Sequence, residues 1–455
     1  MSSFPFHEAA LLRAAERLDA LRRAGPLRSS LPGLRHLVRE VVVVTSSSRG
    51  GSTVLAEVFR RAGGLLNFSA EINPFLLLAG LAHPESGSGS DRLDASHLAL
   101  ADRLEILDRQ LVQDCGHPWH TLEGEAELEQ FAADLAWRLT LQWPLETFTV
   151  NELRAATTAT MGELVSSWGW LPGRFEDPAP FHLLLLLRLR PAHPCLDPYY
   201  YDLPAELIRR VAPELPVPSG PPSPVLIEEP PFVTVQPFLR ATGDELSSRP
   251  LVIKTPSNCY RLDFLRGFFS EARFRILHLT RNAAASINGL MDGWRHRGFF
   301  SHRLPVTLEI SGYSDSEGDW ARHWWKFDLP PGWEALTARP LPEVCAFQWR
   351  SAHQAVLEFV ERSGCDSRRL RFEDFIDPAG REAWARRLLD WLGPGAMATG
   401  PAVLTERLPV TMATEPPRPR RWQGRAELLR PVLESEAILR TMERLDYERE
   451  PASWS

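Results

Sequence analysis

The sequence predicts an α/β fold in which a central parallel sheet is flanked by helices. In residues 41–63, four β-branched residues run into a loop of Ser, Arg and Gly, and an apolar-periodic helix follows. From residue 249 onward, strand-like apolar runs again alternate with helical patterns, as they do in successive βαβ units. The 455 residues, of which 44% are hydrophobic, suffice for one such domain with a sizeable core.

The first unit is the clearest part of the pattern. We expect a strand over 39–45, a loop over 46–51 and a helix over 52–61 that two glycines end. A short apolar segment then predicts a second strand. Because parallel strands end at one edge of a sheet, Glu71 should lie just past this strand, on the same edge as the loop.

Residues of about 76–240 break this order. Helical patterns cover 98–112, 125–141 and 151–168, and Pro-rich links with a run of leucines follow. We interpret the segment as a mainly helical insertion that covers the sheet and shapes a pocket.

The remaining residues return to alternating strands and helices. In chain order, we expect a strand ending at Lys254, a strand ending at Thr280, an irregular connection over 298–341, a helix over 344–364, a strand with an acidic end over 368–375, a helix over 381–393 and a closing helix over 427–445.

Charge and cysteine content exclude several classes of protein. The net charge of −7 argues against general binding to nucleic acid or to an anionic membrane. No apolar run reaches 18 residues, the length that a membrane-spanning helix needs. The five cysteines are scattered and contain no CxxC pair, which favours a reducing compartment and gives no zinc site. We therefore expect a soluble, cytoplasmic protein; oligomeric state is left open.

The loop after the first strand predicts an anion site. Its amides and the N-terminus of the following helix would both point at a ligand such as a phosphate. The segment TSSSRGGST lacks the GxxxxGK[ST] pattern of nucleoside triphosphatases, since Arg49 stands where a Lys might and two glycines follow it. The alternative is a capped helix after a strand, with no ligand.

Lysine is rare in this chain. Of 51 basic residues only Lys254 and Lys326 are lysines, so an ammonium group at the end of a strand is informative. Lys254 is a candidate for neutralising negative charge in the site. The alternative is a strand-end lysine whose charged head reaches solvent.

Four motifs, in order, resemble those of sulfotransferases that use 3′-phosphoadenosine 5′-phosphosulfate. TSSSRGGST resembles their 5′-phosphosulfate loop, and VIKTPSNCYRLDFL their lysine-bearing strand. RILHLTRN with its helix resembles their 3′-phosphate element, and RFEDF their acidic strand end. The resemblance covers 39–75 and 249–450. It implies a P-loop NTPase-like sulfotransferase fold in a single domain over 1–455, with the nucleotide-binding core in the matched segments and the helical insertion shaping the acceptor site.

The resemblance also implies roles for individual residues. Arg49 would bind the 5′-phosphate and sulfuryl oxygens, and Arg281 would bind the 3′-phosphate, because a guanidinium can donate two hydrogen bonds to phosphate oxygens. Lys254 would bind the bridging oxygen. The other implied nucleotide-binding residues are Ser48, Gly50, Gly51, Ser52, Thr53, Ser286, Arg421 and Trp422.

Two departures from the family pattern stand out. Ser286 lies five residues after Arg281, whereas the family's serine lies eight after, so Asn288 could take part of its role. Asn258 stands near the place where related enzymes often carry a histidine.

In-line sulfuryl transfer needs positioned cations and a base for the acceptor proton. Lysine and arginine can neutralise the charge, so no metal is required. Glu71 is the first candidate base, and its alternative role is that of a helix-capping acid. His296 and His302 are the other candidates.

The expected activity is therefore that of a sulfotransferase of bacterial type. The acceptor would be the hydroxyl, or else the amine, of a small molecule or carbohydrate. A nucleotide-dependent kinase and an inactive nucleotide-binding member of the fold are the alternatives. Glu373 and Asp374 are interpreted as structural. Five aromatic residues could line the acceptor pocket or serve in packing alone: Trp294, Phe299, Phe300, Trp324 and Trp325.

Overall fold

A computed structural model of the protein describes residues 13, 16–22, 31, 33–221, 226–393, 408–450 and 454. Its central sheet contains seven strands: β1 (Glu40–Thr45), β2 (Leu66–Phe68), β3 (Cys115–Pro118), β4 (Phe238–Arg240), β5 (Leu251–Lys254), β6 (Arg273–Thr280) and β9 (Asp366–Arg371).

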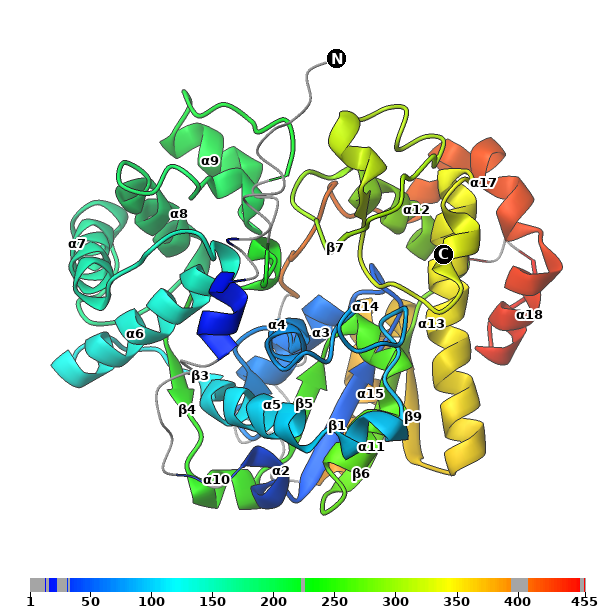
Figure 1. The fold of residues 1–455 in the computed structure, drawn as a ribbon, viewed down its shortest axis with the longest axis horizontal. Coiled ribbons are helices and arrows are strands. Elements are labelled where there is room, and N and C mark those ends of the chain that lie inside the picture. The colour runs from blue at the N-terminus through cyan, green and yellow to red at the C-terminus, as the bar shows by residue number, and fades with distance from the viewer. Residues whose placement is uncertain are drawn as a thin grey trace.

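The strands lie side by side in the order β4-β3-β2-β5-β1-β6-β9 (Figure 1). β2, β5, β1, β6 and β9 run parallel, whereas β3 pairs antiparallel with β2 and β4 antiparallel with β3. The α/β prediction is confirmed. The insertion, however, supplies two strands to the sheet edge and is not purely helical. These strands are too short, and too poor in alternating apolar residues, to stand out in the sequence.

The central strand β1 is buried on both faces, which explains its continuous run of valines. Val41 and Val43 belong to one apolar core, and Val42 and Val44 to the core on the opposite face. Its register with β5 pairs Val44 with Lys254, so the carboxyl ends of these two strands are level.

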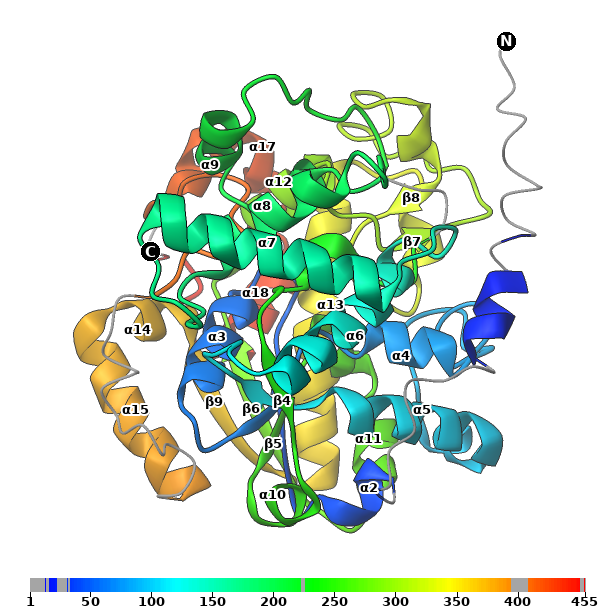
Figure 2. The same ribbon diagram turned by 90° about the vertical axis from the view of Figure 1, so that its left-hand side faces the viewer.

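Helices cover both faces of the sheet (Figure 2). The predicted helix over 52–61 is present as α3 (Ser52–Arg61), and it packs with α15 (Pro378–Leu392) on the face of Val42. The opposite face is covered by α2 (Leu34–Leu37), α5 (Ala101–Asp114), α11 (Leu262–Phe268) and the long α13 (Leu341–Ser363).

The helices of the insertion build an apolar core of their own beside the sheet (Figure 1). They are α6 (Glu125–Gln142), α7 (Val150–Trp168), α8 (Pro178–Leu189) and α9 (Ala205–Val211), and the short α4 (Asn73–Leu78) and α10 (Gly243–Ser248) flank the segment.

A further core joins α13 to the C-terminal helices and to the connection over 298–341. The predicted closing helix is in fact two helices, because Ser435 is extended and its hydroxyl donates to the Val432 carbonyl at 2.7 Å. Elements of this part are α12 (Ala283–Arg295), β7 (His302–Arg303), β8 (Trp324–Trp325), α17 (Ala426–Leu433) and α18 (Glu436–Arg444).

The predicted strand over 368–375 is also shorter than expected. It ends at Arg371, and the next residues form α14 (Phe372–Ile376). The turn into this helix brings the carboxylate of Glu373 to the N-terminus of α12, where it accepts hydrogen bonds from Asn282 N at 3.0 Å and Asn282 Nδ2 at 2.7 Å. Glu373 therefore has the structural role predicted for it.

Two buried histidines join the sheet to α13 and should make the fold sensitive to acid. His278 Nε2 lies 2.9 Å from His353 Nδ1. Burial, then neighbouring His353 and Arg369, holds the pKa of His278 well below its usual value, and burial lowers the pKa of His353 to about 3. Because the unfolded chain binds these protons below pH 6.5 and the folded chain does not, stability is present above that pH and lost as pH falls.

We expect the pair to cost about 4 kcal/mol of unfolding free energy between pH 7 and pH 5. Urea denaturation at both pH values measures this loss, and the variant His278→Leu/His353→Leu should shrink it by that amount. The surface variant His36→Asn is the control and should leave the loss unchanged. A double variant that keeps the full acid sensitivity would contradict the assignment.

Candidate active site

The candidate site lies where the loops after β1 and β6 leave the sheet. The chain crosses from β1 toward β2 on one side and from β6 toward β9 on the other, so a crevice opens between their carboxyl ends. A cavity of about 1180 Å³ lies at this edge. That volume is slightly above the range of about 300–1,000 Å³ that is usual for small-molecule sites.

The loop after β1 is held in a conformation that favours glycine. Gly51 has a φ of 95° and caps α3, and Arg49 also has a positive φ, of 62°. A Cβ atom on Gly51 would lie 2.2 Å from the ring of Phe372. The loop is further fixed by Ser48, whose hydroxyl donates to Asp328 Oδ1 at 2.7 Å.

Replacing Gly51 by alanine should therefore destabilise the protein in two ways. The positive φ costs about 1–2 kcal/mol for a residue with a Cβ, and the collision with Phe372 should add about 1–3 kcal/mol. Gly169→Ala is a matched control, since Gly169 has a φ of 76° and open space around it. Urea denaturation measures the free energy of unfolding of both variants. Equal losses of unfolding free energy would contradict the close approach of Phe372.

Two half-buried guanidinium groups lie next to each other at the loop. Arg281 Nη1 donates to the carbonyl of Arg49 at 3.2 Å, and its charge lies 4.8 Å from the centre of the Phe372 ring. Arg49 donates to the Met412 carbonyl at 2.6 Å and to Thr414 Oγ1 at 3.2 Å. In the part of the chain that the structure describes, neither guanidinium forms an ion pair with a carboxylate.

This arrangement is electrostatically unfavourable without an anion. Burial, then the charge of Arg281, lowers the pKa of Arg49 to about 10. The pKa of Arg281 is also lowered, chiefly by burial. Nearby carboxylates oppose these shifts, Asp292 and Asp202 at Arg49 and Glu373 at Arg281. Because the two like charges still repel each other, an anion bound beside them would stabilise both.

Lys254 and Glu71 form a buried ion pair beside the loop. Lys254 Nζ lies 2.6 Å from Glu71 Oε1 and donates to Thr53 Oγ1 at 3.3 Å. The side chains are 11% and 7% exposed. Glu71 and Thr53 line the main cavity, and with Lys254 they also line an adjoining space of about 40 Å³. The structure thus brings together the loop, the lysine and the first candidate base.

The basic loop near residue 421 also reaches the cavity. Arg421 and Trp422 both line it, and Arg421 is anchored by an ion pair with Asp292. The indole nitrogen of Trp422 is buried and has no hydrogen-bond partner among the described residues. Arg425 also binds Asp292, at 2.6 Å.

Ser286 does not take the place that the family resemblance implies for it. Its side chain is fully buried, and the wall of the cavity at α12 consists of Ala285, Asn288 and Gly289. The shorter spacing after Arg281 thus leaves the serine away from the cavity, while Asn288 lies on its wall. Asn258 is likewise fully buried.

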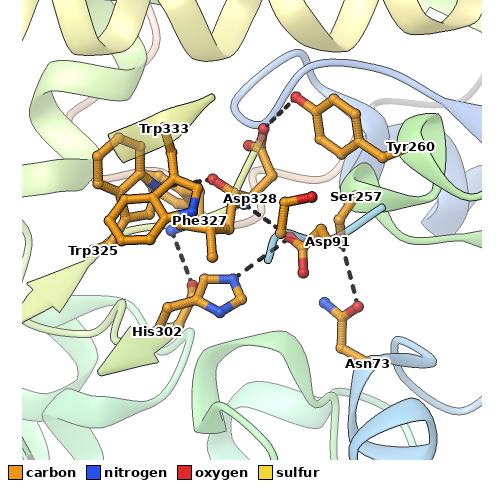
Figure 3. Close-up of polar contacts among 12 residues, drawn as sticks. Asn73, Asp91, Ser257, Tyr260, His302, Trp325, Phe327, Asp328 and Trp333 are labelled. Atoms are coloured by element: carbon orange, nitrogen blue, oxygen red, sulfur yellow. Dashed lines mark hydrogen bonds and ion pairs between the residues drawn. The ribbon is translucent and has the colours of Figure 1, made fainter. Parts of the chain in front are cut away.

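Of the two histidine candidates, only His302 lines the cavity. His302 Nε2 lies 3.5 Å from Asp91 Oδ2 (Figure 3). Asp91 is itself held by Arg261 Nη2 at 3.0 Å. Burial alone would lower the pKa of His302, but the adjacent Asp91 carboxylate outweighs burial and raises it. Burial and the charge of Arg49 instead lower the pKa of His296 to about 4.

Sequence reasoning missed Asp91 and Asp328. Asp328 accepts hydrogen bonds from Ser48 and, at 2.8 Å, from the Tyr260 hydroxyl (Figure 3). Burial raises the pKa of Asp328 to about 6. Both aspartates sit in irregular segments without a motif, so no sequence signal marks them.

The five aromatic residues divide between the two roles considered for them. Phe300 and Trp324 line the cavity. Trp294, Phe299 and Trp325 belong to the apolar core between α12 and α13.

The described residues contain no group of three or more His, Cys, Asp or Glu side chains arranged to hold a metal ion. Among the helices of this part of the chain, none combines the length and apolar character needed to cross a membrane.

Comparison with known proteins adds little to this geometry. No protein-family model matches the chain, and no curated protein matches it significantly. One solved structure, a sulfotransferase domain from the curacin biosynthetic pathway, is similar over 90% of this chain and 99% of its own, with 11% sequence identity and a TM-score of 0.33. That similarity is too weak to assign the activity of the neighbour to this protein.

Proposed function

We propose that the protein transfers a sulfuryl group from 3′-phosphoadenosine 5′-phosphosulfate to a hydroxyl of a small acceptor molecule. The observation that carries the proposal is the pair of half-buried guanidinium groups, Arg49 and Arg281, neither of which forms an ion pair with a carboxylate in the described residues. They lie at the crevice where the loop amides and the N-terminus of α3 also attract anions. The four ordered sequence motifs support the same donor.

The donor molecule has two anionic ends, and the residues present fit both. Arg49, the amide of Gly51, and the hydroxyls of Ser52 and Thr53 would hold the 5′-phosphosulfate, while the amide of Gly50 donates to the Ser47 carbonyl at 3.0 Å and shapes the loop. Arg281, Arg421 and Trp422 would hold the 3′-phosphate. The donor supplies the sulfuryl group and a phosphate leaving group.

The side chains of the protein would neutralise and position the reacting atoms. A bond forms between the acceptor oxygen and sulfur as the bond from sulfur to the bridging phosphate oxygen breaks. Lys254 would stabilise the charge that develops on that bridging oxygen. Glu71 would take the acceptor proton, since its carboxylate lines the cavity beside the lysine.

Glu71→Gln should lower turnover by about 10²–10⁴-fold, because the amide cannot accept the proton. The assay follows ³⁵S from the labelled donor to 2-naphthol, and calorimetry with adenosine 3′,5′-bisphosphate should show unchanged nucleotide affinity. His302→Gln is the matched variant at the second candidate base and should lower turnover less than about tenfold. A large loss in His302→Gln with near-normal turnover in Glu71→Gln would transfer the role of base to His302.

A further inference from the structure

One part of the cavity wall is apolar, whereas the part that contains Arg49, Arg281 and Arg421 is basic. It is supplied by α4, by the segment near residue 227 and by the connection over 298–341. We call it the acceptor wall, and its apolar side chains are Leu77, Leu226, Ile227, Phe232, Phe300 and Trp324.

The aromatic members of the acceptor wall are held rigidly. Phe300 packs edge to face against Trp324, with ring centroids 5.4 Å apart. Phe232 stacks on Phe299 at 5.7 Å, and Phe299 in turn lies 5.5 Å from the guanidinium of Arg49. The wall therefore continues up to the residue proposed to bind the sulfuryl group. An apolar molecule could lie along it at little cost in ordering side chains.

The polar groups beside this wall are largely bonded to one another. Asp91 accepts from Arg261 at 3.0 Å and from Leu329 N at 2.8 Å. Asn73 Oδ1 accepts from Arg261 Nη1 at 2.6 Å, and Glu229 Oε2 accepts from Phe300 N at 2.8 Å. A sugar would have to exchange its bonds to water for groups that are already paired, which costs free energy for each hydroxyl left unbonded.

Hydrogen-bonding capacity remains at a few groups of the cavity, among them the buried Nδ1 of His83, which has no hydrogen-bond partner in the described residues. Glu71 lines the cavity, and in the described residues no partner is found for the second ring nitrogen of His302, Nδ1. Both groups line the same cavity and can hydrogen-bond a hydroxyl bound there. The wall thus offers an apolar surface with few free polar groups beside it.

We infer that the acceptor is an apolar alcohol, aryl or alkyl, that carries one reacting hydroxyl and lacks the many hydroxyls of a carbohydrate. This inference rests on the proposed sulfuryl transfer, and it names the acceptor class for the same site. The apolar body lies against the acceptor wall, and its hydroxyl lies at Glu71 and His302.

The test compares 2-naphthol with N-acetylglucosamine as acceptors for the ³⁵S-labelled donor. We expect kcat/KM for 2-naphthol to be at least about 100-fold higher, because only the naphthyl ring buries apolar surface on the wall. Leu226→Gln should raise the KM for 2-naphthol about tenfold without changing affinity for adenosine 3′,5′-bisphosphate. The matched control is Leu428→Gln, at an exposed leucine outside the cavity, which should leave both unchanged.

Preferred sulfation of N-acetylglucosamine would overturn the acceptor class while the transfer activity stands. An unchanged KM for 2-naphthol in Leu226→Gln would also overturn the acceptor class. If the bisphosphate fails to bind, the proposed function fails instead, and equilibrium dialysis of 2-naphthol then decides the inference alone. Binding that weakens about tenfold in Leu226→Gln supports the apolar site, and undetectable binding overturns it.

Discussion

Replacing Lys254 by methionine is expected to lower turnover about 1000-fold, because the charge on the leaving oxygen then has no ammonium beside it. The same variant should lose about 3–5 kcal/mol of unfolding free energy, since it leaves the carboxylate of Glu71 buried without a cation. Labelled-sulfate transfer measures the first effect and urea denaturation the second. The loss of stability comes from the Lys254–Glu71 contact of 2.6 Å, and the loss of turnover from the missing ammonium.

The double variant Lys254→Met/Glu71→Gln separates stability from catalysis. It removes both charges, so stability should return to within about 1 kcal/mol of the original protein while activity stays lost. A single Lys254→Met variant that is as stable as the original protein would mean that the pair is not formed. Normal turnover in that variant would remove Lys254 from the mechanism.

Arg281→Met should weaken binding of adenosine 3′,5′-bisphosphate about 100- to 1000-fold, because charge-assisted bonds to one phosphate are lost. The ligand-free protein should nevertheless be equally or more stable, since removing one of two adjacent like charges relieves repulsion on Arg49. Calorimetry and urea denaturation measure the two quantities. A variant that gains stability but loses affinity for the bisphosphate is typical of a charged side chain whose role is to bind a ligand.

Arg275, on the strand that leads to Arg281, provides a control. It is more deeply buried than Arg281, but it forms ion pairs with Glu40 at 2.8 Å and with Asp366 at 3.4 Å. Arg275→Met should therefore lose about 1–3 kcal/mol of stability. This is less than for a fully buried ion pair, because the partners Glu40 and Asp366 are partly exposed. Its affinity for the bisphosphate should stay unchanged. If Arg281→Met behaves like this control, the arginine serves the fold and not a ligand.

The parts of the fold that the sequence predicts well are those set by local pattern. The valine run of β1, the following loop and α3 occupy the predicted residues, because apolar periodicity and glycine positions are local properties. The ends of β5 and β6 at Lys254 and Thr280 were predicted for the same reason.

The parts that sequence reasoning missed depend on contacts between distant segments. Nothing near Asp91 in the chain marks it as the partner of His302, since only the packing of the 298–341 connection brings them together. The edge strands β3 and β4 are defined by pairing with each other and with β2, and their own residues carry no alternation. The burial of Ser286 follows from the length of one loop, which a motif match ignores.

The central claim is that this edge of the sheet binds a nucleotide with two separate phosphate groups. Isothermal calorimetry with adenosine 3′,5′-bisphosphate, adenosine 5′-monophosphate and magnesium-ATP tests it directly. The proposed site predicts tight binding of the bisphosphate, at least about 100-fold weaker binding of the monophosphate through loss of the contacts to the 3′-phosphate, and no preference for magnesium-ATP. Tight binding of magnesium-ATP with no detectable binding of the bisphosphate would contradict the claim and favour a kinase.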